Sequence, residues 1–190
     1  MCSRFELNAP ARVVMARFCL KVPPPLPNRA EVRPTDAALV VGSDGPRLGR
    51  WGLEVDWDKR PLINARAETL AAKPTFRRLL GSRVLVPATL WWEWRKEGKA
   101  RHKMRLKPEA ADLFAFAGLA DGERFTLVTC EACTAAAHVH DRMPVVLDPA
   151  AEAAWLDQDQ PFEAVAGALR PWPGGVDVAD DPDGGPGLFD

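Results

Sequence analysis

Short apolar runs, each bounded by turn residues, dominate the middle of the chain. Runs rich in Val, Leu, Ala and Phe occupy residues 37–41, 84–88, 113–119 and 125–130, and each has the length of a β-strand. The turns Ser43-Asp44-Gly45-Pro46 and Asp121-Gly122 follow two of these runs and are typical of hairpins. The pattern predicts strands that pair mostly in antiparallel fashion.

Helical patterns are shorter and fewer. Val14 and Phe18 fall at helical spacing after Asn8, a residue that suits a helix cap. Further helices are expected at 74–80, after Asp148-Pro149, and from residue 161 to 169. Short strands in hairpins with a few flanking helices predict an α+β fold with a mostly antiparallel sheet.

Length and composition predict one globular domain followed by a tail. The chain has 190 residues, of which 47% are hydrophobic and 27% charged. No apolar run approaches the roughly 18 residues of a membrane span, and the first residues lack the apolar core of a secretory signal. The four cysteines are too few and too unevenly spaced for a disulfide framework. We therefore expect a monomeric cytoplasmic protein without a membrane partner.

Charge is distributed unevenly between the expected domain, residues 1–170, and the tail, residues 171–190. The tail holds five aspartates and no Lys or Arg, so the domain retains 21 acidic residues against 25 basic ones. This mildly basic domain is compatible with a polyanionic partner. The tail is rich in Pro, Gly and Asp and is expected to be disordered, with Leu188-Phe189 as a weak docking motif or an idle end.

The first residues, Met1-Cys2-Ser3-Arg4-Phe5, carry the first candidate chemistry. Removal of Met1 would leave Cys2 with an α-amine and a thiol on adjacent carbons. An α-amine has a pKa of about 8, so much of it is unprotonated at neutral pH and can attack an aldehyde. The alternative is an incidental cysteine in a frayed terminus, but apolar Phe5 and Leu7 indicate that this segment joins a core.

Two polar patterns are ambiguous on periodicity alone. Glu93 stands among tryptophans in Trp91-Trp92-Glu93-Trp94. Burial there would raise its pKa and make it a general acid or base, whereas exposure beside Arg95 would make it part of a solvated face. Asn64, Arg66 and Glu68 alternate, so an extended segment would place them on one side, as a site or as a solvated edge.

Two further clusters suggest phosphate or metal binding. Residues 95–107 are rich in Lys and Arg around a turn at Glu97-Gly98, and form either a solvated hairpin or one that contacts phosphates. Cys130 and Cys133 are followed by His138 and His140, which have one intervening residue instead of the usual three to five of a zinc site. We expect neither a metal nor another cofactor.

Several short blocks occur in an order that resembles one family. They are Met-Cys-x-Arg-Phe, Trp-Gly-Leu, Asn-Ala-Arg-Ala-Glu-Thr, Lys-Pro-Thr-Phe-Arg, Trp-x-Glu-Trp after Pro-Ala, Phe-Ala-Gly-Leu and His-Asp-Arg-Met-Pro-Val-x-Leu. From Met1 to about Leu156 the chain is similar to the SRAP family, the SOS-response-associated peptidase-like proteins that crosslink to abasic sites in single-stranded DNA. The resemblance implies a barrel-like antiparallel β core with flanking short helices.

The resemblance also implies site residues. The catalytic positions fall on Cys2, Asn64, Glu93 and His140. Candidate contacts to single-stranded DNA fall on Arg4, Pro34, Trp57, Arg66, Arg77, Thr129 and Arg142. The chain departs from the family at Ser3, where Gly is usual, at Leu90-Trp91-Trp92, where Gly-Phe-Tyr is common, and at Asp56, which leaves Trp57 without a tryptophan neighbour.

The implied function is a DNA-damage response in which freed Cys2 bonds the sugar aldehyde of an abasic site and closes a thiazolidine ring. In that chemistry Glu93 moves protons during sugar ring opening, and His140 supplies an acid for loss of water. The resemblance thus implies an enzyme, an abasic-site-reactive lyase that crosslinks itself to DNA. The first alternative is a cysteine peptidase or autoprotease with Cys2 as nucleophile, His140 as base and Glu93 as orienter. The second is a non-catalytic DNA-binding or zinc module. On DNA, the cytoplasmic protein would associate with the nucleoid.

Overall fold

A ring of five strands forms one half of the fold. The computed structural model describes residues 2–27 and 30–181. Hydrogen bonding runs in the order β11-β8-β3-β4-β12, and pairing of β12 with β11 closes the ring. Two short strands extend it from β12. The strands are β3 (Ala37–Gly42), β4 (Gly45–Trp51), β8 (Arg83–Ala88), β11 (Phe114–Asp121) and β12 (Arg124–Glu131), with β7 (Asn64–Arg66) and β13 (Arg142–Pro144) attached.

A second sheet of five strands carries the amino-terminal segment. Its order is β14-β10-β9-β1-β2, and all of its pairings are antiparallel. The strands are β1 (Arg4–Glu6), β2 (Glu31–Val32), β9 (Leu90–Glu97), β10 (Ala100–Pro108) and β14 (Val176–Asp180). A separate hairpin consists of β5 (Leu53–Val55) and β6 (Asp58–Leu62). The expected α+β class with a mostly antiparallel, barrel-like core is confirmed.

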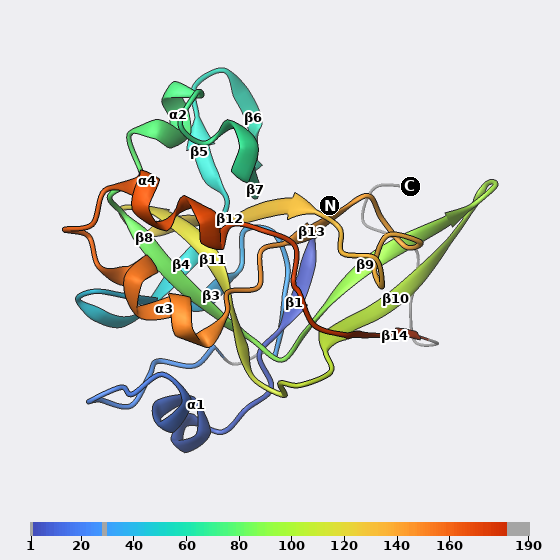
Figure 1. The fold of residues 1–190 in the computed structure, drawn as a ribbon, viewed down its shortest axis with the longest axis horizontal. Helices are drawn as coiled ribbons and strands as arrows, with labels where there is room; N and C mark the ends of the chain where they lie inside the picture. Colours follow the sequence, from blue (N-terminus) through green and yellow to red (C-terminus); the bar gives the residue numbers. More distant parts are fainter. Residues whose placement is uncertain (1, 28–29, 182–190) are drawn as a thin grey trace.

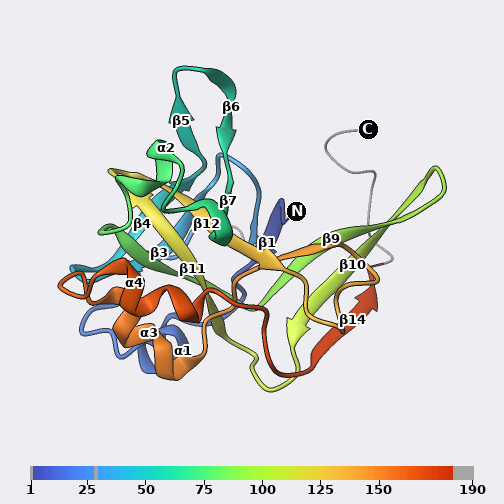
Figure 2. The ribbon, with the colours of Figure 1, turned by 45° about the horizontal axis from the view of Figure 1, so that its top comes forward.

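Two hairpins project from the body on either side of β1 (Figures 1 and 2). One is β5–β6, at the top of Figure 1, and the other is β9–β10, at the right. The second is the basic hairpin expected from the sequence, and its turn falls between Glu97 and Ala100. The beginning of β1 therefore lies between the β5–β6 and β9–β10 hairpins.

Short helices flank the ring at several places (Figures 1 and 2). They are α1 (Ala11–Arg17), α2 (Pro74–Arg77), α3 (Pro149–Leu156) and α4 (Phe162–Val165), with 3-10 turns at Ala67–Thr69 and Ala166–Ala168. The Asp148 side chain accepts a hydrogen bond from the Ala150 backbone N–H and caps α3. The cap expected at Asn8 is wrong, because Pro10 occupies the cap position of α1 without a side-chain hydrogen bond.

Aromatic packing anchors β1 in the core. Phe5 is fully buried, with its ring centroid 5.1 Å from that of Trp51 and 5.9 Å from that of Phe116, both edge-on. Burial of a phenylalanine contributes about 1.5–3 kcal/mol, which is enough to order a three-residue strand that is also paired on both edges. The expectation that the amino-terminal segment joins the core is confirmed.

The tail differs from expectation. Disorder was predicted from residue 171, but residues 176–180 form β14, which pairs with β10 from Met104 to Pro108. That part of the prediction is wrong, because Val176 is buried and the aspartates of the strand lie beside the basic hairpin. Leu188-Phe189 lies outside the described residues.

Candidate active site

Cys2 lies inside the protein just before β1. Its side chain is fully buried, and its thiol donates a hydrogen bond to the Arg4 carbonyl at 3.4 Å. The Asn64 Nδ2 donates to the Cys2 carbonyl at 2.8 Å, and so holds the backbone of the cysteine from β7. The Asn64 Oδ1 is buried and accepts no hydrogen bond within the described part of the chain. The Asn64 Oδ1 can therefore accept a hydrogen bond from a donor group of a bound molecule.

Glu93 belongs to the interior. It is 2% exposed, on the strand that pairs with β1, and burial raises its pKa to about 7. Of the two readings of the tryptophan-rich segment, the buried one is therefore confirmed. The pKa of the Cys2 thiol is raised well above its ordinary value, first by burial and then by the negative charge of Glu93. Electrostatic coupling thus joins the two groups in one site.

His140 lies in the turn before β13, next to Asp141, whose charge also raises the pKa of Glu93. Its side chain is 29% exposed, and burial is the main cause that lowers its pKa. The Arg142 backbone N–H donates to Nδ1 at 3.0 Å, which requires that Nδ1 carries no proton. Asp141 Oδ1 lies 2.7 Å from the same nitrogen, a contact that suits the protonated ring. The two contacts are alternatives, and we favour the first in the neutral ring, whose proton is then on Nε2.

The Arg142 side chain ties the histidine turn to the ring. Its guanidinium donates twice to the Glu68 carboxylate, at 3.1 and 3.0 Å, and also to the Thr129 carbonyl at 2.8 Å. Thr129 is fully buried on β12. Glu68 therefore fixes Arg142, whose backbone contacts His140. Sequence reasoning placed Glu68 beside Asn64 but assigned it no role; the alternation of polar residues was the available signal.

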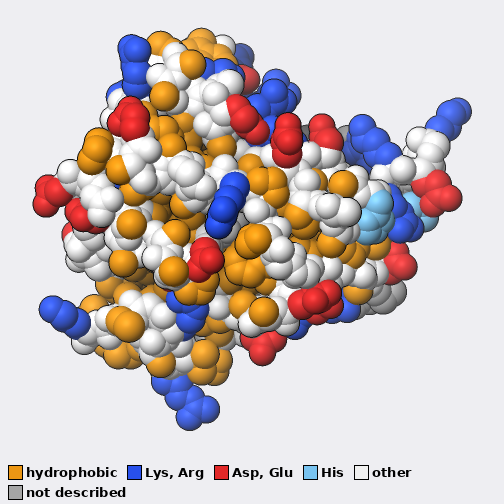
Figure 3. All heavy atoms as spheres, in the orientation of Figure 1, with side chains coloured by type: hydrophobic (Ala, Val, Ile, Leu, Met, Phe, Trp, Pro, Cys, Tyr) orange, Lys and Arg blue, Asp and Glu red, His pale blue; other side chains and the backbone are white. Residues whose placement is uncertain are grey.

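The residues predicted to contact DNA lie in different settings. Arg4 is 8% exposed, with its guanidinium 3.3 Å from Glu31 and 5.4 Å from the ring centroid of Trp94. Trp57 is 68% exposed at the β5–β6 turn. Figure 3 shows Lys and Arg side chains at the projecting ends of both hairpins. The other candidates are buried Thr129, partly buried Pro34 and Arg142, and exposed Arg66 and Arg77. DNA contact stays a prediction for each of them.

The two cysteines of the Cys-x-x-Cys segment are buried in the apolar core as free thiols. Cys130 and Cys133 are both buried, and burial raises the pKa of Cys130 to about 12. Among residues 2–27 and 30–181, no group of three or more His, Cys, Asp or Glu side chains is placed to hold a metal ion. Within those residues no helix has the length and apolar character needed to cross a membrane.

The charges around His140 predict two opposite pKa changes. Asp141→Asn should lower the pKa of His140 further, because the Asp141 charge raises it, and Lys96→Gln should raise it, because the Lys96 charge lowers it. NMR titration of the imidazole C–H resonance measures both. Asp112→Asn, which changes another exposed aspartate that contacts Lys107, serves as the control. Shifts of the same sign in both variants would contradict this arrangement.

Known proteins resemble the chain in sequence and in fold. The family model described as "SOS response associated peptidase (SRAP)" matches residues 1–179. The Bacillus subtilis protein named "Abasic site processing protein YoqW" is 36% identical, over 83% of this chain and 80% of that protein. The Escherichia coli protein named "Abasic site processing protein YedK" is 28% identical, over 84% and 81%. A crystal structure of a Bacteroides thetaiotaomicron protein has the same fold, with a TM-score of 0.84, 23% identity and coverage of 96% and 93%.

Proposed function

The chain is a member of the SRAP family, and we propose that it processes abasic sites in DNA by a covalent reaction at Cys2. The observation that carries the proposal is the meeting of Cys2, Asn64 and Glu93 in one buried site beside His140. Relatives named as abasic site processing proteins support the same role. The direct test is incubation with abasic single-stranded DNA followed by denaturing electrophoresis, in which a covalent adduct is expected.

The reaction proceeds through the amine before the thiol. After removal of Met1, the Cys2 amine adds to the aldehyde carbon of the opened sugar and forms a carbinolamine. Loss of one water gives a Schiff base, and the sulfur then adds to the same carbon while its proton passes to the nitrogen. Because the pKa of the buried thiol is raised, little thiolate exists at neutral pH to start the reaction. The amine titrates much closer to neutrality.

Glu93 and His140 serve different proton transfers. An abasic sugar is mostly a closed hemiacetal, so ring opening needs a proton donor at the ring oxygen and an acceptor at the hydroxyl. A carboxyl with a pKa of about 7 is available in both forms at neutral pH and suits this step. The acid at His140 is the imidazolium, in which Nδ1–H faces the Asp141 carboxylate 2.7 Å away and the Nε2 proton is given to the departing hydroxyl. The ring then returns to the neutral form, in which Nδ1 accepts from the Arg142 backbone N–H. Asn64 holds the cysteine without titrating.

Single-stranded DNA is the proposed partner because exposed basic and aromatic groups frame the site. Binding should weaken with salt, with a slope in log Kd against log salt of roughly 0.7 for each phosphate contact. Intact duplex should bind less well, because Trp57 stacks only on unpaired bases.

Trp57→Ala should weaken the binding free energy for single-stranded DNA by roughly 1–3 kcal/mol. Leu48→Ala, which changes another exposed apolar residue, is the control. Fluorescence anisotropy measures each Kd; equal affinity for duplex and single strand would contradict the proposal.

A peptidase is the alternative, given the family's name. A cysteine peptidase works through a thiolate, and the raised pKa of the Cys2 thiol opposes its formation. A variant that retains Met1 separates the two functions. It loses the free α-amine needed for the DNA adduct, whereas the thiol needed by a peptidase is unchanged.

A further inference from the structure

The β9–β10 hairpin carries a second set of cationic and aromatic side chains, on the face opposite Glu93. Cross-strand partners in an antiparallel pair lie on the same side of the sheet. Glu93 pairs with Met104, and both are buried. The opposite face therefore carries the alternate pairs, which are Trp92 with Arg105, Trp94 with Lys103, and Lys96 with Arg101.

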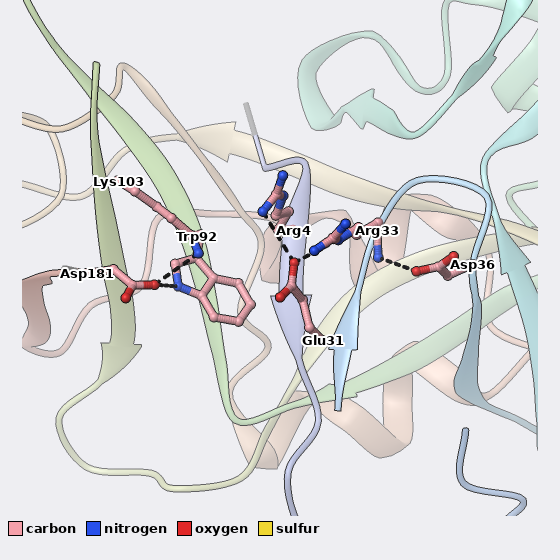
Figure 4. Close-up of polar contacts among 7 residues, drawn as sticks. All are labelled: Arg4, Glu31, Arg33, Asp36, Trp92, Lys103 and Asp181. Atoms are coloured by element: carbon pink, nitrogen blue, oxygen red, sulfur yellow. Dashed lines mark hydrogen bonds and ion pairs between the residues drawn. The ribbon is translucent and has the colours of Figure 1, made fainter. Parts of the chain in front are cut away.

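Two donors on this outer face converge on one oxygen. Trp92 Nε1 lies 2.6 Å and Lys103 Nζ 3.0 Å from Oδ2 of Asp181 (Figure 4). Lys103 Nζ also lies 4.7 Å from the centroid of the Trp92 ring. The Lys103 side chain is 9% exposed and that of Asp181 11%, so the contact is largely shielded from water. A cation and an indole N–H directed at a single anionic oxygen can hold either a carboxylate or a phosphate oxygen.

The segment that supplies Asp181 is the end of an edge strand with few buried side chains, and besides the ladder with β10 the Asp181 N–H donates to the Lys103 carbonyl at 2.9 Å. Asp181 directly follows β14, a five-residue strand at the edge of the sheet, in which only Val176 is buried. Its neighbour Asp180 lies 4.0 Å from Arg95, at the limit of an ion pair. Regions with few buried apolar contacts open locally at a free energy below that of global unfolding. The Asp181 carboxylate is therefore exchangeable for another anion.

We propose that Trp92 and Lys103 form a phosphate site for single-stranded DNA flanking the reacting sugar, and that Asp181 occupies this site until DNA displaces it. The inference rests on the proposed function and extends the DNA path to the outer face. β1 pairs with β9 only from Leu90 to Trp92, so beyond Trp92 this edge of β9 has no ladder partner among the described strands. Arg105 and Arg101 continue the cationic face on either side of Lys103.

The test compares neighbouring aspartates in the full chain. Asp181→Asn removes the competing charge and should tighten binding of an unmodified oligodeoxythymidine about 3- to 10-fold, with a salt slope steeper by roughly 0.7. Asp180→Asn removes the same charge one residue away and should change Kd far less. Asp181→Glu keeps the charge and should bind as the parent does. In a Lys103→Gln background the gain from Asp181→Asn should disappear, because the phosphate has lost its cation.

Two outcomes would overturn the inference. One is equal tightening by Asp181→Asn and Asp180→Asn, which would reflect net charge alone. The other is a gain that persists in the Lys103→Gln background. Thermal unfolding of each variant confirms that the fold is retained. Failure of the proposed function looks different: the parent would then form no adduct with abasic DNA, whereas here the parent crosslinks normally and only the Asp181 effect is absent.

Discussion

Replacement of Cys2 by alanine should abolish the adduct that survives denaturation. Cys2→Ala keeps an α-amine after removal of Met1, so it can form a Schiff base, but it has no sulfur to close the ring. A Schiff base hydrolyses on denaturation, so this variant should give an adduct only after borohydride reduction. Denaturing electrophoresis with abasic single-stranded DNA, with and without borohydride, measures both species.

Other cysteines of the chain provide the control. Cys19→Ala removes an exposed thiol and Cys130→Ala a buried one, and both should crosslink as the parent does. An adduct from Cys2→Ala that is equally stable without borohydride would show that the thiol takes no part.

Glu93→Gln should slow crosslinking to abasic DNA by roughly 10²- to 10⁴-fold, the range for loss of a general acid or base. Glutamine keeps the size and polarity of the side chain but cannot exchange a proton. A simple open-chain aldehyde needs no ring opening, so its reaction with Cys2 should be slowed much less. Single-turnover kinetics with both substrates separates the two steps. A Glu93→Gln variant as fast as the parent on abasic DNA would make the carboxylate structural.

The same variant has a stability effect of defined sign. The pKa of Glu93 in the folded protein is about 7, above its ordinary value of 4.5, because burial disfavours the charged form. Stability from this group is therefore complete below about pH 4.5 and is lost as pH rises through 7. Relative to the parent, Glu93→Gln should gain stability between pH 5 and 8. Thermal unfolding across that range also shows that slow crosslinking does not come from misfolding.

Local patterns predicted the elements better than their partners. Continuous apolar runs predicted β3, β8, β11 and β12, because the side chains of those strands are buried. The basic hairpin was predicted from Lys and Arg residues on both sides of the turn at Glu97-Gly98. The prediction of disorder in the tail was wrong for residues 176–180. The composition of the tail is typical of disordered segments, and the local sequence does not show that β10 can pair with it. Val176 and the aspartates of β14 find their partners about 70 positions earlier in the chain.

The candidate site was predicted as separate residues and not as a network. The hydrogen bond from Asn64 to Cys2 and the ion pair of Arg142 with Glu68 join positions more than 60 residues apart, so periodicity could not reveal them. Burial of Glu93 was one of two readings that the sequence left open, and the fold decided it through pairing of β9 with β1 and β10. The remaining candidate site residues, Asn64 and His140 among them, were predicted from the positions that match the family motifs.

The most direct measurement is mass spectrometry of the peptide crosslinked to abasic single-stranded DNA. The account predicts a peptide that begins at Cys2, lacks Met1 and carries the sugar with loss of one water. When no borohydride is used, the Cys2 sulfur in this peptide should not react with iodoacetamide, because it is bonded to the sugar carbon. An adduct that retains Met1, lies on a lysine, or leaves the Cys2 thiol free to alkylate would contradict the claim that one residue supplies both the amine and the sulfur.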